Sequence, residues 1–342
     1  MEFQIIWFVL WGVLWSVYFM LDGFVMGSGM LHHILGKNDG ERRVMINIIG
    51  PVWDGNEVWL ITAGGATFAA FPTTYALMFS YLYTPLLLLL FALIVRGVSY
   101  EFRGKENGAT WKKGWDLAIA VCNFLPALLF GVAFGNIFRG LPMDGAGYHG
   151  SLLYLLNPYG LLTGVLFVLL FVVHGALYAT VKTTGELSAR ALGVANKVWP
   201  VLTVVAVAFL AYTYPATRLY DNFLQHPVFL VAPLLAVAAL LGIRVLTAQQ
   251  KPLAAFAASC ITILMVVATG VIGLFPNLIP SNMGAEFSLT AFNSSSSLYT
   301  LKIMTVVAAI FVPIVIVYKI WVYRVFRAKL TIEDLVGNKH AY

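Results

Sequence analysis

The sequence predicts an all-α integral membrane protein that crosses the bilayer about nine times, with its N-terminus outside and its C-terminus in the cytoplasm. Of its 342 residues, 60% are hydrophobic and only 11% are charged, whereas a soluble domain is about one-quarter charged. The apolar runs are long and unbroken, which favours helices over the short alternating strands of a membrane barrel. Basic residues gather in alternate loops, and this asymmetry predicts the orientation.

The apolar runs define about nine expected spans, because each exceeds the roughly 20 residues that cross a hydrocarbon core. They cover residues 3–35, 50–72, 74–103, 114–138, 158–181, 190–213, 226–247, 252–276 and 299–325. Pro200 and Pro233 interrupt the sixth and seventh runs. We see no soluble segment and no internal repeat, so we expect residues 1–342 to form a single polytopic transmembrane domain.

Lysine and arginine fix the expected orientation. Of 21 such residues, 18 fall toward one side of the expected helices, and only Arg139, Arg218 and Lys302 fall toward the other. The positive-inside rule places the larger set in the cytoplasm, which requires an odd number of spans. The larger set is Lys37, Arg42, Arg43, Arg96, Arg103, Lys105, Lys112, Lys113, Lys182, Arg190, Lys197, Arg244, Lys251, Lys319, Arg324, Arg327, Lys329 and Lys339.

The composition argues against several other roles. The net charge of +6 indicates no nucleic-acid partner, because the basic residues are dispersed among loops that face anionic lipid headgroups. Cys122 and Cys260 lie in apolar runs without CxxC spacing, so we interpret both as packing residues. The first apolar run is too long for a secretory signal.

Asp22 is the clearest charged residue at membrane depth. It precedes the end of the first expected helix by some thirteen residues, about 20 Å at 1.5 Å per residue, which places it near the bilayer middle. Gly23, Gly27 and Gly29 follow it and would let a neighbouring helix approach closely. Buried acids of this kind often serve proton transfer; the alternative is a structural hydrogen bond to a neighbouring helix.

Asp54 and Glu57 begin the second expected helix, three residues apart and therefore on one face. Two partly desolvated carboxylates on one face suit a proton relay, because each can load and release a proton. The alternative interpretation is that Asp54 simply complements the helix dipole in the first turn after Pro51.

Arg96 lies before the end of the third expected helix. We expect its guanidinium to snorkel to the membrane surface. The alternative is an ion pair with a carboxylate of the first or second helix.

The histidines predict that this chain ligates no haem iron. His174 alone lies well inside an expected helix, and it has no paired ligand; we expect a hydrogen-bonded interior residue. Met20, Met26 and Met30 are expected to be packing residues. The remaining histidines fall at helix ends, in outer loops or in the tail, namely His32, His33, His149, His226 and His340.

Several segments in order along the chain resemble subunit II of the cytochrome bd-type quinol oxidases. The most specific are DGFVMGSGML from Asp22 and GKNDGERRVMINIIGPVWDGNEVWLITAGGATFAAFP ending at Pro72. The others are RGVSYEFR (96–103), GVAFGNIFRG (131–140), LLNPYGLLTG (155–164), TTGEL (183–187), GLFPNLIPS (273–281) and NSSSSLYTLKIM (293–304). The resemblance covers essentially the whole chain.

The resemblance implies a subunit of a bacterial cell-membrane complex that oxidises quinol and reduces dioxygen to water. It implies a partner, subunit I, that holds the haems of b and d type, so this chain alone is not expected to be catalytic. A proton path from the cytoplasm is implied at Asp54, and an oxygen route near Trp59. The resemblance leaves open a further small single-helix subunit.

The chain departs from the family pattern at two positions. Many relatives carry a second acid directly after the DGF triplet, where this chain has Val25. Position 57, often Gln in the family, is Glu57 here. We therefore hypothesise that Glu57 offsets the acid missing at position 25.

A secondary transporter or ion channel is the alternative function. Transporters of this size carry intramembrane acids and broken helices, and Pro200, Pro233 and Pro313 could mark such breaks. Co-purification of a coloured haem-bearing chain would discriminate the two, because a transporter should be colourless.

Overall fold

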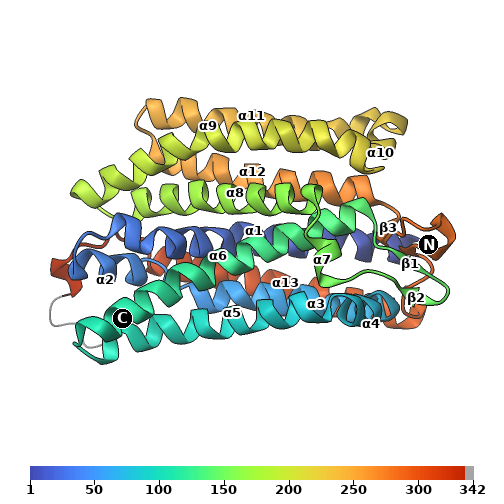
Figure 1. Ribbon diagram of the computed structural model, residues 1–342, viewed down its shortest axis with the longest axis horizontal. Helices are drawn as coiled ribbons and strands as arrows, with labels where there is room; N and C mark the ends of the chain where they lie inside the picture. The colour runs from blue at the N-terminus through green and yellow to red at the C-terminus, as the bar shows by residue number, and fades with distance from the viewer. Residues whose placement is uncertain (336–342) are drawn as a thin grey trace.

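The computed structural model describes residues 1–335, and these form a bundle of long helices that lie nearly parallel (Figure 1). Lys339, His340 and Tyr342 lie outside the described residues. The long helices are α1 (Glu2–Leu35), α3 (Trp53–Ala70), α5 (Tyr83–Phe102), α6 (Ala109–Arg139), α8 (Pro158–Lys182), α9 (Gly185–Ala216), α11 (Val231–Ala248), α12 (Pro252–Leu274) and α13 (Leu298–Val325).

Short elements connect these helices. The short helices are α2 (Asp39–Asn47), α4 (Pro72–Tyr81), α7 (Leu152–Leu155) and α10 (Asp221–Gln225). Two antiparallel pairs of strands form the loops at one end: β1 (Met143–Asp144) with β2 (Gly147–Tyr148), and β3 (Asn277–Ile279) with β4 (Leu289–Thr290).

Each predicted span corresponds to a helix, with one division. Within the described residues, 8 helices are long and apolar enough to cross a membrane. The counterpart of the second predicted span, α3, is not among them; its 18 residues are long enough, but its first turns carry polar side chains. The third predicted helix, 74–103, is divided at Leu82 into α4 and α5. The total of about nine crossings remains a prediction.

The prolines do not break the helices, contrary to expectation. Pro200 lies inside α9 and Pro313 inside α13, and both helices continue through them. Pro233 lies in the first turn of α11, where its missing N–H has no helical partner to lose. Transmembrane helices tolerate internal proline because neighbouring groups satisfy the freed carbonyls.

The helices stack in layers around α1 and α8 (Figure 1). One outer layer holds α9 and α11, the middle holds α8, α12, α1 and α6, and the opposite side holds α3, α5 and α13. In its most apolar stretch α8 is 67% buried, whereas α13 is 0% buried. Gly27 and Gly175 bring α1 and α8 into backbone contact, because a Cβ at either position would overlap the other helix.

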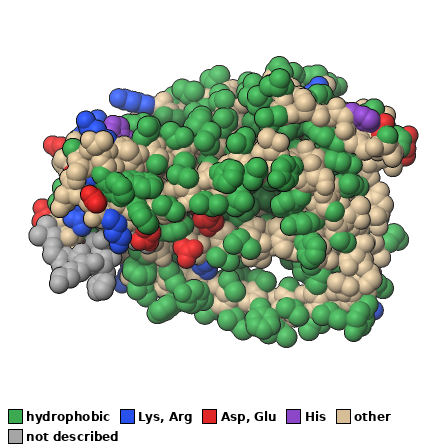
Figure 2. Space-filling model, turned by 60° about the horizontal axis from the view of Figure 1, so that its bottom comes forward, with side chains coloured by type: hydrophobic (Ala, Val, Ile, Leu, Met, Phe, Trp, Pro, Cys, Tyr) green, Lys and Arg blue, Asp and Glu red, His purple; other side chains and the backbone are tan. Residues whose placement is uncertain are grey.

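On the face seen in Figure 2, lysine and arginine side chains gather at the end of the molecule where α2 lies (Figures 1 and 2). We call this the basic end. If it is cytoplasmic, reporter proteins fused after Tyr342 and within the 277–298 loop should report opposite sides of the membrane. Reporters on the same side would contradict an odd number of crossings between that loop and the tail.

Candidate functional site

A buried ion-pair cluster joins three helices near the basic end. The Arg96 guanidinium of α5 donates from Nη1 to Asp22 Oδ2 of α1 at 2.8 Å, and its Nη2 lies 3.2 Å from Glu57 Oε2 of α3. Arg96 and Asp22 are both fully buried. The snorkelling interpretation of Arg96 is therefore wrong, and the residue makes the ion pair that was its alternative. Removing both charges from water is costly, and this cost makes the pairing obligatory.

The cluster lies closer to the basic end than the position of Asp22 along α1 suggests. Glu57 is in the second turn of α3 and Arg96 is six residues before the end of α5, about 9 Å by helical rise. With 34 residues, α1 is about 50 Å long and extends past its partners, since a hydrocarbon core is about 30 Å thick. Asp22 therefore lies level with the first turns of α3.

The charges in this cluster do not cancel. Asp22 and Glu57 supply two carboxylates to the single Arg96 guanidinium, so the fully ionised cluster carries one net negative charge. Two polar atoms of the cluster itself, Asp22 Oδ1 and Arg96 Nε, and the neighbouring Tyr18 Oη are buried without a hydrogen-bond partner among residues 1–335. Buried polar atoms of this kind are typical binding partners of ordered water.

Asp54 lies at the surface, one turn from the cluster. It is exposed at the start of α3 and forms no ion pair within the described residues. Between Asp54 and Glu57, Asn56 is buried and donates to the Leu21 carbonyl at 2.8 Å. The Asn56 Oδ1 accepts from the Tyr323 hydroxyl at 2.9 Å and lies 3.4 Å from Lys319 Nζ. We did not single out these three polar side chains in the sequence.

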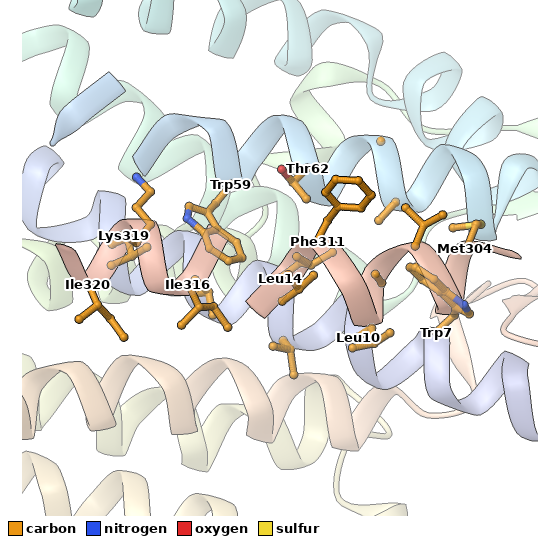
Figure 3. A pocket seen from close by; sticks show the side chains of 18 of the residues that line it. Trp7, Leu10, Leu14, Trp59, Thr62, Met304, Phe311, Ile316, Lys319 and Ile320 are labelled. Carbon is orange, nitrogen blue, oxygen red and sulfur yellow. The ribbon is translucent and has the colours of Figure 1, made fainter. Parts of the chain in front are cut away.

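An apolar groove of about 940 Å³ runs between α1, α3 and α13. Figure 3 shows Trp59 and Thr62 of α3 facing Ile316 and Phe311 of α13 across it. Its walls are almost entirely hydrophobic, and Lys319 lies toward its basic end. Trp59, expected to mark an oxygen route, is one of the residues that line this apolar groove.

His174 is an interior residue with both ring nitrogens engaged. Nδ1 lies 2.7 Å from Ser259 Oγ, Nε2 lies 2.9 Å from the Met20 carbonyl oxygen, and the ring stacks on Phe256. A haem ligand needs a free ring nitrogen, so this arrangement does not fit an iron ligand. Among residues 1–335, no three His, Cys, Asp or Glu side chains gather as a metal site.

We accordingly predict that His174→Gln leaves the haem content of the purified complex unchanged. Gln can still donate to the Met20 carbonyl, so the helices should remain packed. The measurement is pyridine-haemochrome analysis of the complex, with and without the substitution. Loss of one haem per complex, with the subunits still associated, would contradict the prediction that this chain ligates no haem iron.

A second charged network holds the basic end together, and we did not predict it. Asp116 of α6 accepts from Arg42 Nη1 at 2.9 Å, lies 2.7 Å from His32 Nε2, and is ion-paired with Arg103. Asp39 of α2 extends the network to Arg103 at 2.9 Å.

The network also favours the ionised form of Asp39 on α2. Burial opposes ionisation of Asp39, but hydrogen bonds from Lys112 and Arg103 outweigh it and lower the pKa of this carboxyl. Because α2 is thereby clamped to α6, the chain entering α3 has a fixed position. This network thus positions Asp54 and Glu57 without contributing to their cluster.

The chain resembles known proteins along almost its whole length. Residues 3–326 match the family model described as cytochrome bd terminal oxidase subunit II. The chain is 38% identical to cytochrome bd-I ubiquinol oxidase subunit 2 of Escherichia coli K12, over 99% of this chain and 98% of that one. It is also 38% identical to cytochrome bd ubiquinol oxidase subunit 2 of Bacillus subtilis 168, over 96% and 97%.

The fold also has a counterpart of known structure. A chain of the bd oxidase from Geobacillus thermodenitrificans superimposes with a TM-score of 0.78 at 17% identity, covering 95% of this chain and 99% of that one. The long apolar helices and these relatives indicate a multi-pass protein of the bacterial plasma membrane. On the strength of the match over residues 3–326, the chain belongs to the cytochrome bd terminal oxidase subunit II family.

Proposed function

We propose that this chain is the non-haem subunit of a quinol:dioxygen oxidoreductase, and that it conducts protons from the cytoplasm toward the oxygen-reducing haem of its partner. The observation that carries the proposal is the buried Asp22–Arg96–Glu57 cluster, with Asp54 at the surface one helical turn away. The haems, of b and d type, and the quinol site belong to subunit I in this proposal. A further small single-helix subunit remains compatible with it.

Asp54 is the entry of the proposed route. It is exposed near the basic end, and Glu57 follows it on the same face of α3. The Arg96 guanidinium contacts both Glu57 and Asp22, and so holds the two carboxylates on either side of one side chain. A carboxyl group suits each step, because its protonated form donates and its ionised form accepts.

The charge balance of the cluster supports proton storage. One carboxylate can pair with Arg96 while the other holds a proton, and the cluster is then neutral. Ordered water next to Tyr18, Asp22 and Arg96 would complete the hydrogen-bonded chain. Glu57 brings a second carboxylate to Arg96, which supports the hypothesis that it offsets the acid missing at Val25.

The groove beside Trp59 suits dioxygen. Dioxygen is apolar and partitions into hydrocarbon, and the groove walls are hydrophobic from Trp7 to Ile316. We propose that oxygen reaches the partner subunit along this groove, separately from the protons. The two routes share α3, which carries Asp54 and Glu57 on one side and Trp59 on another.

The outer face of α3 is the proposed contact with subunit I. Asp54, Val58, Ile61 and Phe68 are exposed at helical spacing, although α3 is too polar to qualify as a membrane span. A Cβ at Gly65 on this face would meet open space. Membrane helices associate closely through such small residues, and a face with an acid and glycine suits protein better than lipid.

Ile61→Trp tests this contact. Ile61 is 70% exposed, so tryptophan fits the isolated chain and should interfere only with a closely packed partner. We expect less haem to co-purify with the affinity-tagged chain. The matched control is Val204→Trp, a 69% exposed position on α9, the helix that lies in the outer layer opposite α3. Equal haem recovery from both variants would place the contact elsewhere.

The proton route is tested by removing its entry carboxyl. A complex with Asp54→Asn that assembles with its haems should oxidise quinol more slowly than wild type. The transporter alternative predicts neither a haem-bearing partner nor quinol oxidation. The continuity of α9 and α13 through Pro200 and Pro313 removes the broken helices that favoured it.

A further inference from the structure

We propose that Lys319 of α13 is a positioning residue for the proton route: its ammonium group supplies the second positive charge that leaves the carboxylates with one exchangeable proton. This inference rests on the proposed function, since it concerns the same acids. None of the segments that carry the family resemblance contains Lys319, and the charge pattern groups it with the residues of the cytoplasmic loops.

The structure places Lys319 inside the helix bundle. It lies six residues before the end of α13, about 9 Å by helical rise. Its side chain extends from α13 toward α3 (Figure 3). Nζ lies 3.4 Å from Asn56 Oδ1, and it occupies the space beside Gly55 that a Cβ there would need. The ammonium group therefore sits directly over the helical turn that carries Asp54 and Glu57.

Lys319 has no ion-pair partner at contact distance within the described residues, yet it is half-buried. It interacts electrostatically with Asp54 and Asp22. A lysine at this depth is costly unless it faces protein charges. Lys319 therefore acts on the acid cluster through its electrostatic potential and forms no direct ion pair among residues 1–335. Because no carboxylate is held by Lys319, each can still exchange its proton.

A count of the facing charges gives the consequence. Three carboxylates belong to the set around Lys319: Asp54 and Asp22 interact with it electrostatically, and Glu57 joins them through Arg96. Arg96 from α5 is the other cation, and Tyr323 is the neutral neighbour on α13. With Lys319 the set carries one net negative charge and becomes neutral with one proton; without Lys319 it needs two. Arg324 and Arg327 are exposed beyond the cluster and neutralised by lipid headgroups or solvent.

The test uses the assembled complex and four variants. Lys319→Met and Lys319→Gln remove the charge, and Gln keeps a donor for Asn56. Both should slow quinol oxidation about tenfold or more, with the KM for quinol and the haem content unchanged. Lys319→Arg keeps the charge and should retain most of the turnover. Lys302→Met, at the opposite end of the same helix, is the control and should behave as wild type.

A charge-restoring double variant separates electrostatics from packing. Glu57→Gln combined with Lys319→Met returns the set to one net negative charge. Turnover should lie well above the level that additive losses of the two single variants give, because the double variant again becomes neutral with one proton. A purely structural Lys319 predicts additive losses, and that result would overturn the inference.

The remaining outcomes separate this inference from the proposed function. Slow quinol oxidation in Asp54→Asn, with wild-type turnover in Lys319→Met and Lys319→Gln, would overturn the role of Lys319 but leave the proposed proton route intact. Wild-type turnover in Asp54→Asn would contradict the proposed proton route and, with it, the role of Lys319. Loss of haem in the Lys319→Arg complex would show that the side chain serves assembly, against the inference.

Discussion

Replacing Arg96 by methionine is expected to prevent recovery of an intact, haem-bearing complex. Arg96 is fully buried and pairs with Asp22 at 2.8 Å and with Glu57 at 3.2 Å. Methionine fills much of the volume but leaves Asp22 as a fully buried charge without its cation. Breaking one side of a buried pair costs about 3–5 kcal/mol, a large part of the stability of a domain. The measurement is the amount of co-purified haem per tagged chain.

The control for this prediction is Arg244→Met. Arg244 is exposed on α11, and within residues 1–335 its side chain donates only to Asn196, at 2.8 Å. Its removal should therefore leave haem recovery unchanged. Adding Asp22→Asn to Arg96→Met removes the unpaired charge and should restore part of the yield. A full yield of complex from Arg96→Met alone would mean that the cluster does not stabilise the fold.

Asp54→Asn is expected to slow quinol oxidation by at least roughly tenfold, which corresponds to about 1.4 kcal/mol in the barrier. Asn is nearly isosteric with Asp but cannot pick up and release a proton. Because Asp54 is exposed and forms no ion pair among the described residues, its replacement leaves no buried partner unpaired. Asn also keeps the shape of Asp in the proposed contact with subunit I, so haem content and subunit association should stay near wild type.

Glu57→Gln is the matched comparison for Asp54→Asn. It should slow turnover less, because Arg96 keeps Asp22 as its partner and the family resemblance implies that Gln is tolerated at this position. An assembled Asp54→Asn complex with wild-type turnover would leave Asp54 with only the helix-terminus role. Loss of haem in that variant would assign Asp54 to assembly instead.

The helices could be predicted because their cause is local. Each long apolar run must satisfy its own backbone in lipid, and the runs at 3–35, 158–181 and 252–276 correspond closely to α1, α8 and α12. The division at Leu82 has no comparable signal, since the apolar run continues across it. The expected helix breaks at the prolines were wrong, because the continuity of a helix through proline depends on neighbouring helices that a sequence does not reveal.

The acids of the site could be predicted, but their partners could not. Asp22, Asp54 and Glu57 stand out as carboxylates in apolar surroundings. Arg96 lies 74 residues from Asp22, and whether it snorkels or turns inward depends on which face of α5 meets α1. That choice is made by tertiary packing. A signal was available for Lys319, since the apolar residues on both sides of it continue for a further turn.

The most direct test of the account follows proton uptake in a single turnover. The fully reduced complex, reconstituted in vesicles with its basic end outward, is mixed rapidly with oxygen while a pH dye outside reports protons and haem absorbance reports oxygen reduction. In wild type, protons should disappear from the medium at the basic end as oxygen is reduced. In Asp54→Asn, oxygen should still bind at the wild-type rate while proton uptake slows by roughly tenfold or more. Proton uptake at the wild-type rate in Asp54→Asn would contradict the proposed route through this subunit.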